Sequence, residues 1–195
     1  MREERGERRK NRSVRPLSYR LSPLFAAIGR QIAAIGSLIR VWGNRVSDTG
    51  WKQNIIEDVQ GIKALLHATR RIAVLGIKTE AQASQPAFYV ARYLDSAGLE
   101  VIPVPVYYPE VKQILGKPVY RKLVDVPGEI DLVDVFRRPH DIDPHVDDIL
   151  AKKPKAVWFQ LGIRNDKAAQ RLAEAGIKVV QDRCLMVDHR QLAVR

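Results

Sequence analysis

Arg71-Ile72-Ala73-Val74-Leu75-Gly76-Ile77 is a short, almost wholly apolar run that ends near a glycine. Such a run, in which polar and apolar residues do not alternate, is typical of a β-strand that is buried on both faces. Strands of this kind lie in parallel sheets that helices cover on either side. The stretch therefore predicts a strand of an α/β domain.

Predicted helices and strands alternate along the chain on both sides of this run. Residues 52–69 carry six apolar side chains in helical register and predict one continuous helix. Three later helices are predicted from their start signals, which are Ser84 with Pro86, Asp143 with Pro144, and Asn165. Further strands are predicted at residues 101–104, 131–136, 155–161 and 177–181. This repetition implies a Rossmann-like α/β domain over residues 52–195, with a doubly wound, mostly parallel five-stranded sheet and helices on both faces.

The composition limits the possible partners. The chain has 195 residues and a formal net charge of +11. Residues 1–50 hold 11 of the 33 Lys/Arg but only 4 of the 22 Asp/Glu, so the basic excess is concentrated in an N-terminal arm. We therefore expect no nucleic-acid partner for the domain, although a pI near 10 would otherwise favour one.

Cysteine and histidine usage is also informative. Cys184 is the only cysteine in the sequence, which excludes an intrachain disulfide and fits a reducing, cytoplasmic location. The four histidines lack the spacing of a structural zinc site, so no metal site is expected.

The arm, residues 1–50, has two parts. Residues 2–20 are rich in arginine and predict disorder. In residues 22–43, apolar side chains recur every three or four positions and predict an amphipathic helix, which Arg30 and Arg40 make too polar for a membrane span. Three alternatives stay open: weak contact of this helix with a membrane surface, an organelle transit peptide, or a weakly structured extension created by an early start codon.

Unusual residues gather where the predicted strands end. In an open parallel sheet, ligands bind beyond the carboxyl ends of the strands. Gly76 lies at the end of the first strand, Arg137 and Arg138 follow the strand at 131–136, and Gln160 lies at the end of the next strand. Arginine side chains at such an edge can bind phosphates, whereas an isolated basic pair is more often a solvated surface charge. The joint placement of these residues favours a ligand site.

Each candidate also has a plain structural interpretation. Gly76 permits a tight turn, Asn165 is a typical helix cap, and Cys184 is typical of a small buried residue. The G-x-G-x-x-G motif is missing, which counts against conventional NAD binding.

Five motifs resemble those of the stand-alone coenzyme A-binding protein family. They are Val-Leu-Gly at 74–76, Ser-Gln-Pro at 84–86, Asp-Leu-Val-Asp-Val-Phe-Arg-Arg-Pro at 131–139, Trp-Phe-Gln-Leu-Gly-Ile at 158–163 and Asp-Arg-Cys at 182–184. The resemblance covers roughly residues 70–192 and leaves the arm outside. That family is related to the CoA-binding domain of succinyl-CoA synthetase. The resemblance therefore implies a single Rossmann-like domain that binds coenzyme A at the carboxyl ends of the strands.

The resemblance also implies roles for individual residues. Gly76, Lys78 and Ser84 lie along the pyrophosphate or pantetheine path, and Pro105 borders the adenosine. Phe136, Arg137 and Arg138 supply a wall and positive charge, and Gln160, Gly162 and Asn165 close the site. The loop after Gly76 reads Ile-Lys-Thr-Glu-Ala-Gln-Ala, whereas family members often have a shorter loop rich in Ser and Pro, so contacts there are expected to differ.

The leading functional expectation is non-catalytic binding of coenzyme A or an acyl-CoA. The sequence shows neither the phosphohistidine nor the grasp domain of acyl-CoA ligases, and it presents no recognisable set of nucleophile, base and orienting residue. Three alternatives stay open. They are a redox role in which Cys184 exchanges disulfides with the CoA thiol, an NAD(P)-binding protein of the same fold, and an interaction protein tethered to acidic membrane by its arm.

Overall fold

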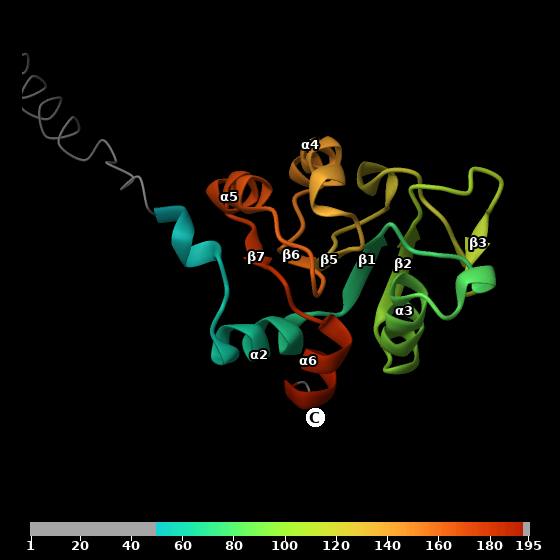
Figure 1. The fold of residues 1–195 in the computed structure, drawn as a ribbon, viewed down its shortest axis with the longest axis horizontal. Helices are drawn as coiled ribbons and strands as arrows, with labels where there is room; N and C mark the ends of the chain where they lie inside the picture. The colour runs from blue at the N-terminus through green and yellow to red at the C-terminus, as the bar shows by residue number, and fades with distance from the viewer. Residues whose placement is uncertain (1–49, 193–195) are drawn as a thin grey trace, which may run out of the picture. The chain divides into compact units, whose positions relative to one another are not determined.

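The computed structural model describes residues 50–192, which belong to one compact unit. Five parallel strands form its central sheet, in the order β2-β1-β5-β6-β7 (Figure 1). Their bounds are β1 Arg71–Leu75, β2 Glu100–Val104, β5 Leu132–Val135, β6 Ala156–Phe159 and β7 Lys178–Val180. The predicted α/β fold with a five-stranded parallel sheet is therefore confirmed.

The strand order creates one switch point. From β1 the chain crosses to β2 at one edge, and it then returns past β1 to β5 and continues outward through β6 and β7. This order is one of the two common doubly wound arrangements, in which the crevice at the switch point receives ligands. Here the switch point lies between the carboxyl ends of β1 and β5.

Helices cover both faces of the sheet (Figure 1). On one face lie α2 (Val59–Ala68), α3 (Pro86–Ser96) and α6 (Leu185–Leu192), whose buried side chains share one hydrophobic cluster. On the other face α4 (Asp143–Lys152) and α5 (Asp166–Glu174) pack over a second cluster. Because consecutive strand residues point to opposite faces, Val133 and Val135 of β5 face the second cluster and Leu132 faces the first.

The prediction of one helix over residues 52–69 is wrong. A 3-10 turn, η1 (Gly50–Asn54), comes first, and Ile55 then forms a parallel bridge with Val179 at the outer edge of β7. Only after Asp58, whose carboxylate accepts from Gly61 N at 2.8 Å, does α2 begin. Ile55 and Ile56 are apolar because they pack against different faces of the sheet, not because they share one helical stripe.

Two elements are not predicted from the sequence. A small antiparallel hairpin, β3 (Gln113–Ile114) and β4 (Lys117–Pro118), lies beyond β2, and α6 follows the last strand. Pro103 of β2 pairs in register with Val74 of β1. Proline is tolerated there because β2 is an edge strand of the sheet.

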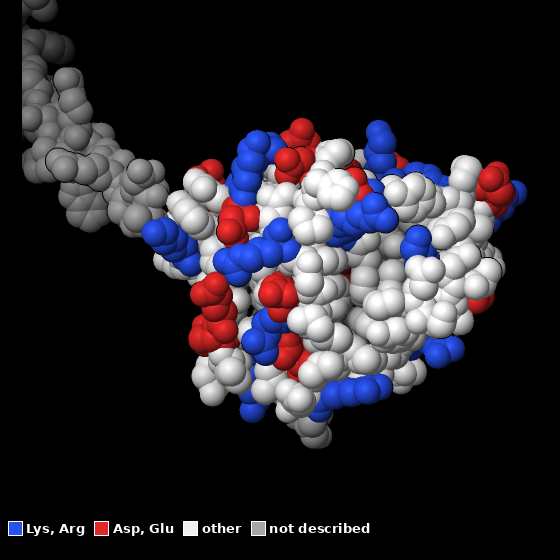
Figure 2. Space-filling model, viewed as in Figure 1, with Lys and Arg blue, Asp and Glu red and all other residues white. Residues whose placement is uncertain are grey.

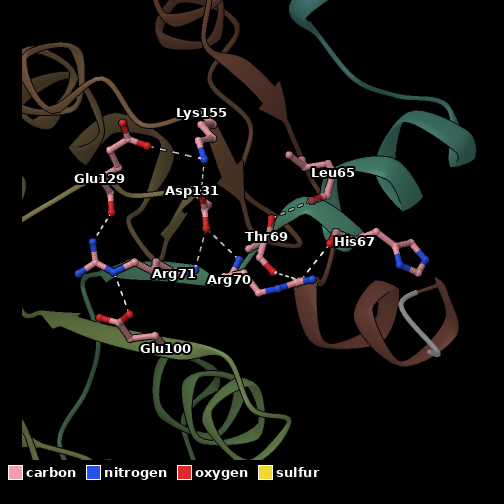
Figure 3. A network of polar contacts seen from close by, with 9 residues as sticks. All are labelled: Leu65, His67, Thr69, Arg70, Arg71, Glu100, Glu129, Asp131 and Lys155. Carbon is pink, nitrogen blue, oxygen red and sulfur yellow. Dashed lines mark hydrogen bonds and ion pairs between the residues drawn. The ribbon is translucent and has the colours of Figure 1, made fainter.

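Asp131 ties four strands together at the amino end of the sheet (Figure 3). Its carboxylate accepts hydrogen bonds from the backbone amides of Arg70 and Arg71, both at 2.9 Å, and from Lys155 Nζ at 2.7 Å. Arg71 Nε donates in turn to Glu100 Oε2 at 2.8 Å. Burial alone would raise the pKa of Asp131, but these hydrogen bonds outweigh it and lower the pKa. This network lies at the end opposite to the switch point.

Several predictions concern residues that the structure does not describe. The disorder of residues 2–20 and the amphipathic helix at 22–43, with its membrane contact, lie outside the described range. Within residues 50–192, every helix is too short or too polar to cross a membrane.

Candidate functional site

The backbones of two strand ends approach closely at the switch point. Gly76 has φ +89°, and a Cβ added there would lie 2.5 Å from the carbonyl oxygen of Phe136. Gly76 N donates to Val104 O, and Phe136 N donates to Leu75 O, both at 2.9 Å. These bonds hold the ends of β2, β1 and β5 in place, so only glycine fits between them.

A cleft of about 450 Å³ opens at this edge, on the face that carries α3 and α6. Its walls come from the start of α3, the loops after β5 and β6, and the turn before α6. The lining residues are Gln85, Pro86, Ala87, Tyr89, Val90, Phe136, Arg137, Arg138, Pro139, Gln160, Leu161, Gly162, Ile163 and Cys184. A mostly apolar cleft with a few polar groups is the usual form of a cofactor site.

Arg137 is the most unusual side chain in this cleft. Only 11% of the side chain is exposed, and its Nε is buried without any hydrogen-bond partner. Its Nη2 lies 3.5 Å from Asp141 Oδ2, and its guanidinium stacks over the Tyr107 ring at 5.2 Å. Buried guanidinium donors are normally satisfied. Arg137 therefore has unused capacity to bind an anion.

Lys78 lies near the same aromatic ring. Its Nζ is 5.2 Å from the centre of the Tyr107 ring and 3.3 Å from the Tyr108 hydroxyl. Tyr107 is 52% exposed and thus contacts two cationic side chains at the molecular surface. On the face shown in Figure 2, acidic and basic side chains are interspersed and do not form one positive patch. Lys78 and Arg137 are the two cations that contact the Tyr107 ring.

The start of α3 adds one further donor. Gln85, the N-cap residue, makes no side-chain capping hydrogen bond, and Pro86 occupies the first turn. Both residues line the cleft. Pro86 has no N–H and Phe88 N donates to Gln85 O at 2.9 Å, so the Ala87 amide is the free donor of this turn. A helix N-terminus attracts anions, so this end of α3 can complement the charge of Arg137.

Three polar side chains lie beneath the cleft on one face of β5 and β6. Asp134 is fully buried and accepts from Gln160 Nε2 at 2.8 and 3.1 Å. Burial raises the pKa of Asp134 to about 8, although the hydrogen bond from Gln160 opposes this rise. Gln160 Oε1 accepts from Leu185 N at 3.4 Å, and Trp158 Nε1 donates to Arg183 O at 2.7 Å.

The structure brings most of the predicted site residues together. Five of them line the cleft: Phe136, Arg137, Arg138, Gln160 and Gly162. Gly76 abuts Phe136, and Lys78 meets Arg137 across Tyr107.

Besides Gly76 and Lys78, three predicted residues lie outside this lining. Ser84 is exposed just before the α3 N-cap. Asn165 caps α5 through Ala168 N at 2.9 Å and donates to Pro139 O at 2.9 Å, so its visible role is to tie α5 to the loop after β5. Pro105 lines a separate hollow of about 620 Å³ beside α4. His145 also lines that hollow, and its pKa is lowered by burial and by the nearby charge of Arg137.

Sequence reasoning missed Tyr107 and Asp134 as members of the site. Tyr107 follows the end of β2, and this position beyond a strand end indicates a candidate site residue. Its contacts with Lys78 and Arg137, however, depend on the fold of the loop. Asp134 is a single acidic residue inside an apolar strand, and such a residue needs a partner that only the sheet register reveals. Among the described residues, no cluster of three or more His, Cys, Asp or Glu side chains is arranged to hold a metal ion.

A family model described as a CoA binding domain matches residues 70–190, which is more than half of the chain. The chain belongs to this family. The matched range contains β1, the switch point and every lining residue of the cleft. The family resemblance that the sequence motifs predict is thus confirmed.

Individual proteins are also similar to this chain over the matched domain. The protein YneT of Bacillus subtilis (strain 168) is 33% identical over 128 residues, covering 66% of this chain and 91% of YneT. A solved structure from Thermus thermophilus shows 40% identity and a TM-score of 0.64, covering 70% of this chain and 99% of its own. Another, from Pyrococcus horikoshii OT3, shows 30% identity and a TM-score of 0.63, covering 71% and 94%. The similarity extends over nearly the whole length of these relatives.

Proposed function

We propose that the cleft binds coenzyme A or an acyl-CoA without transforming it. Membership in the CoA-binding family gives the ligand class. The cleft lies at the switch point, where doubly wound sheets receive nucleotide ligands.

The observation that carries the proposal is the state of Arg137. Its side chain is almost completely buried, yet Nε has no partner. A phosphate oxygen at this position would satisfy Nε and gain a charge-assisted hydrogen bond. The start of α3 forms part of the cleft wall, and Lys78 contacts the same Tyr107 ring as Arg137; both would neutralise the second phosphate of a pyrophosphate.

The remaining lining suits the uncharged arm of the ligand. Tyr89, Val90 and Ile163 contribute apolar surface to the same lining as Arg137 and Cys184. Pantetheine is a flexible chain with amide groups, and a mostly apolar slot with a few polar groups would bind it. We therefore orient the phosphates toward Arg137 and the thiol toward Cys184.

The lining offers little for catalysis. Cys184 is the one strong nucleophile among these residues, and the lining contains no His, Asp or Glu that would activate it. This composition supports binding in preference to acyl transfer.

Isothermal titration of the full chain tests the proposal. We expect coenzyme A to bind with a dissociation constant in the micromolar range, about −8 kcal/mol, and NADPH to give no heat. Arg137→Met should weaken coenzyme A binding by about 10- to 100-fold, which corresponds to the loss of one charged hydrogen bond. Arg171→Met is the matched control, since Arg171 lies on α5 and pairs with Asp147 at the surface. Absence of heat with coenzyme A, or equal affinities for both variants, would contradict the proposal.

A second candidate is thiol exchange, because Cys184 is half-buried and lines the cleft. In this reaction the Cys184 thiolate attacks a coenzyme A disulfide, one sulfur–sulfur bond breaks, and free coenzyme A leaves as a mixed disulfide forms. Intact mass spectrometry after incubation with coenzyme A disulfide, compared with glutathione disulfide, tests this candidate. Equal labelling by both disulfides would rule out a specific exchange.

A further inference from the structure

We propose that Asp134 is a positioning residue of the cleft, which acts through Gln160 to hold the Arg183–Leu185 turn and thereby fixes Cys184 in the cleft wall. The inference rests on the proposed function in one respect only, which is that the positioned Cys184 would face bound coenzyme A. The contacts that carry it belong to the protein alone.

The first step concerns the environment of Asp134. It lies in β5 between Val74 of β1 and Trp158 of β6, and its exposed fraction is 0%. Within residues 50–192 the only hydrogen bonds to its carboxyl group come from Gln160, and it forms no ion pair. A buried carboxyl group without a cation is costly to a fold unless it has another role.

The second step concerns the orientation of Gln160. Its exposed fraction is 4%, and both ends of its amide are engaged: Nε2 donates to Asp134, and Oε1 accepts from Leu185 N. A reversed amide would place Nε2 against the N–H of Leu185, where two donors would oppose each other. An acceptor at position 134 therefore determines which way Gln160 points.

The third step concerns the turn that Gln160 holds. Leu185 N is fixed by Gln160, and Arg183 O is fixed by Trp158 Nε1 at 2.7 Å. These two contacts flank Cys184, and the Cys184 carbonyl accepts from Asp188 N at 3.0 Å at the start of α6. The backbone on both sides of Cys184 is thus held by side chains that rise from the sheet.

A kinetic test uses the fact that Cys184 is the only cysteine of the chain. The rate of its alkylation by N-ethylmaleimide, measured on the full chain without ligand, reports on the position of the turn. Asp134→Leu should change this rate by about fivefold or more, and Gln160→Met should change it by a similar factor. The double variant should change it no further than either single variant, because both act through one link.

Two controls separate positioning from a general loss of stability. Thr69→Val removes a buried hydroxyl, bonded to Leu65 O at 2.8 Å, at the opposite end of the sheet, and should leave the Cys184 rate within about twofold of the original. Asp134→Asn keeps an acceptor for Gln160 Nε2 and should also stay within about twofold. The Gln160→Met variant decides the question if Asp134→Leu does not fold.

The proposal is overturned if Asp134→Leu and Gln160→Met leave the alkylation rate unchanged, if their effects add independently, or if Thr69→Val changes the rate equally. Because alkylation is measured without coenzyme A, these outcomes do not depend on the proposed function. A failure of coenzyme A to bind the unaltered chain would refute the proposed function and leave the positioning result intact.

Discussion

The close approach at Gly76 can be tested with a pair of glycine variants. In Gly76→Ala, the new Cβ would lie 2.5 Å from Phe136 O, well inside the 3.4 Å at which ordinary contact begins. In Gly98→Ala, nothing lies within 4 Å of the new Cβ. The two glycines have nearly the same positive φ, +89° and +85°, so the penalty that a positive φ imposes on alanine, about 1–2 kcal/mol, applies to both variants.

The difference between the two variants isolates the clash. To relieve it, Gly76 must shift away from the Phe136 carbonyl. This shift separates the ends of β1 and β5, which weakens the bond from Phe136 N to Leu75 O, and it moves Gly76 N away from its position against Val104 O. At about 1 kcal/mol for each bond, Gly76→Ala should lose about 2 kcal/mol more than Gly98→Ala. Urea unfolding followed by circular dichroism measures both free energies. A difference below about 0.5 kcal/mol would refute the reasoning, because it would mean that the strand ends separate freely.

Three further predictions concern polar side chains that hold the domain together. Asp131→Asn should lose about 2 kcal/mol at pH 7 in urea unfolding, and the loss should shrink below pH 4, because a lowered pKa stabilises the fold only while the carboxylate is charged. Burial raises the pKa of Asp134 to about 8, so the free energy of unfolding should fall as the pH rises from about 4 to 8, by up to about 1.4 kcal/mol per pH unit. Asp134→Leu should flatten this slope, and parallel slopes for the two proteins would contradict a raised pKa for the buried carboxyl group. Asn165→Ala should cost about 2 kcal/mol in thermal unfolding against about 1 for Asp58→Ala, because Asn165 also bonds the loop after β5; equal costs would mean that only its capping bond matters.

The sheet could be predicted from the sequence because its strands are nearly uniform apolar runs. Residues 71–77 and 131–136 are buried on both faces, so burial dictates their composition with little influence from distant contacts. The helix starts at Pro86 and after Asn165 could also be predicted from the sequence, because capping depends on neighbouring residues alone.

Other elements depend on contacts between distant residues. Residues 52–69 have a helical pattern, but pairing of Ile55 with Val179 overrides it. The strands of the β3–β4 hairpin have two residues each, which is too short to leave a periodic pattern. In the cleft, the sequence places Arg137 and Gln160 at strand ends, whereas the bond between Gln160 and Asp134 follows from the pairing of β5 with β6. Which of these residues contact coenzyme A stays a prediction.

The parallel bridge between Ile55 and Val179 has a practical consequence for trimming the chain. The family match begins at residue 70, yet η1 and the bridge shield the outer edge of β7, and Asn54 Nδ2 donates to Ala173 O at 2.8 Å. Cutting at residue 70 would uncover this edge together with the apolar surface under α2, where Ile62, Leu65 and Leu66 are buried. An unprotected edge strand recruits strands from other molecules. A shortened protein that begins at residue 50 should therefore stay monodisperse, whereas one that begins at residue 70 should self-associate.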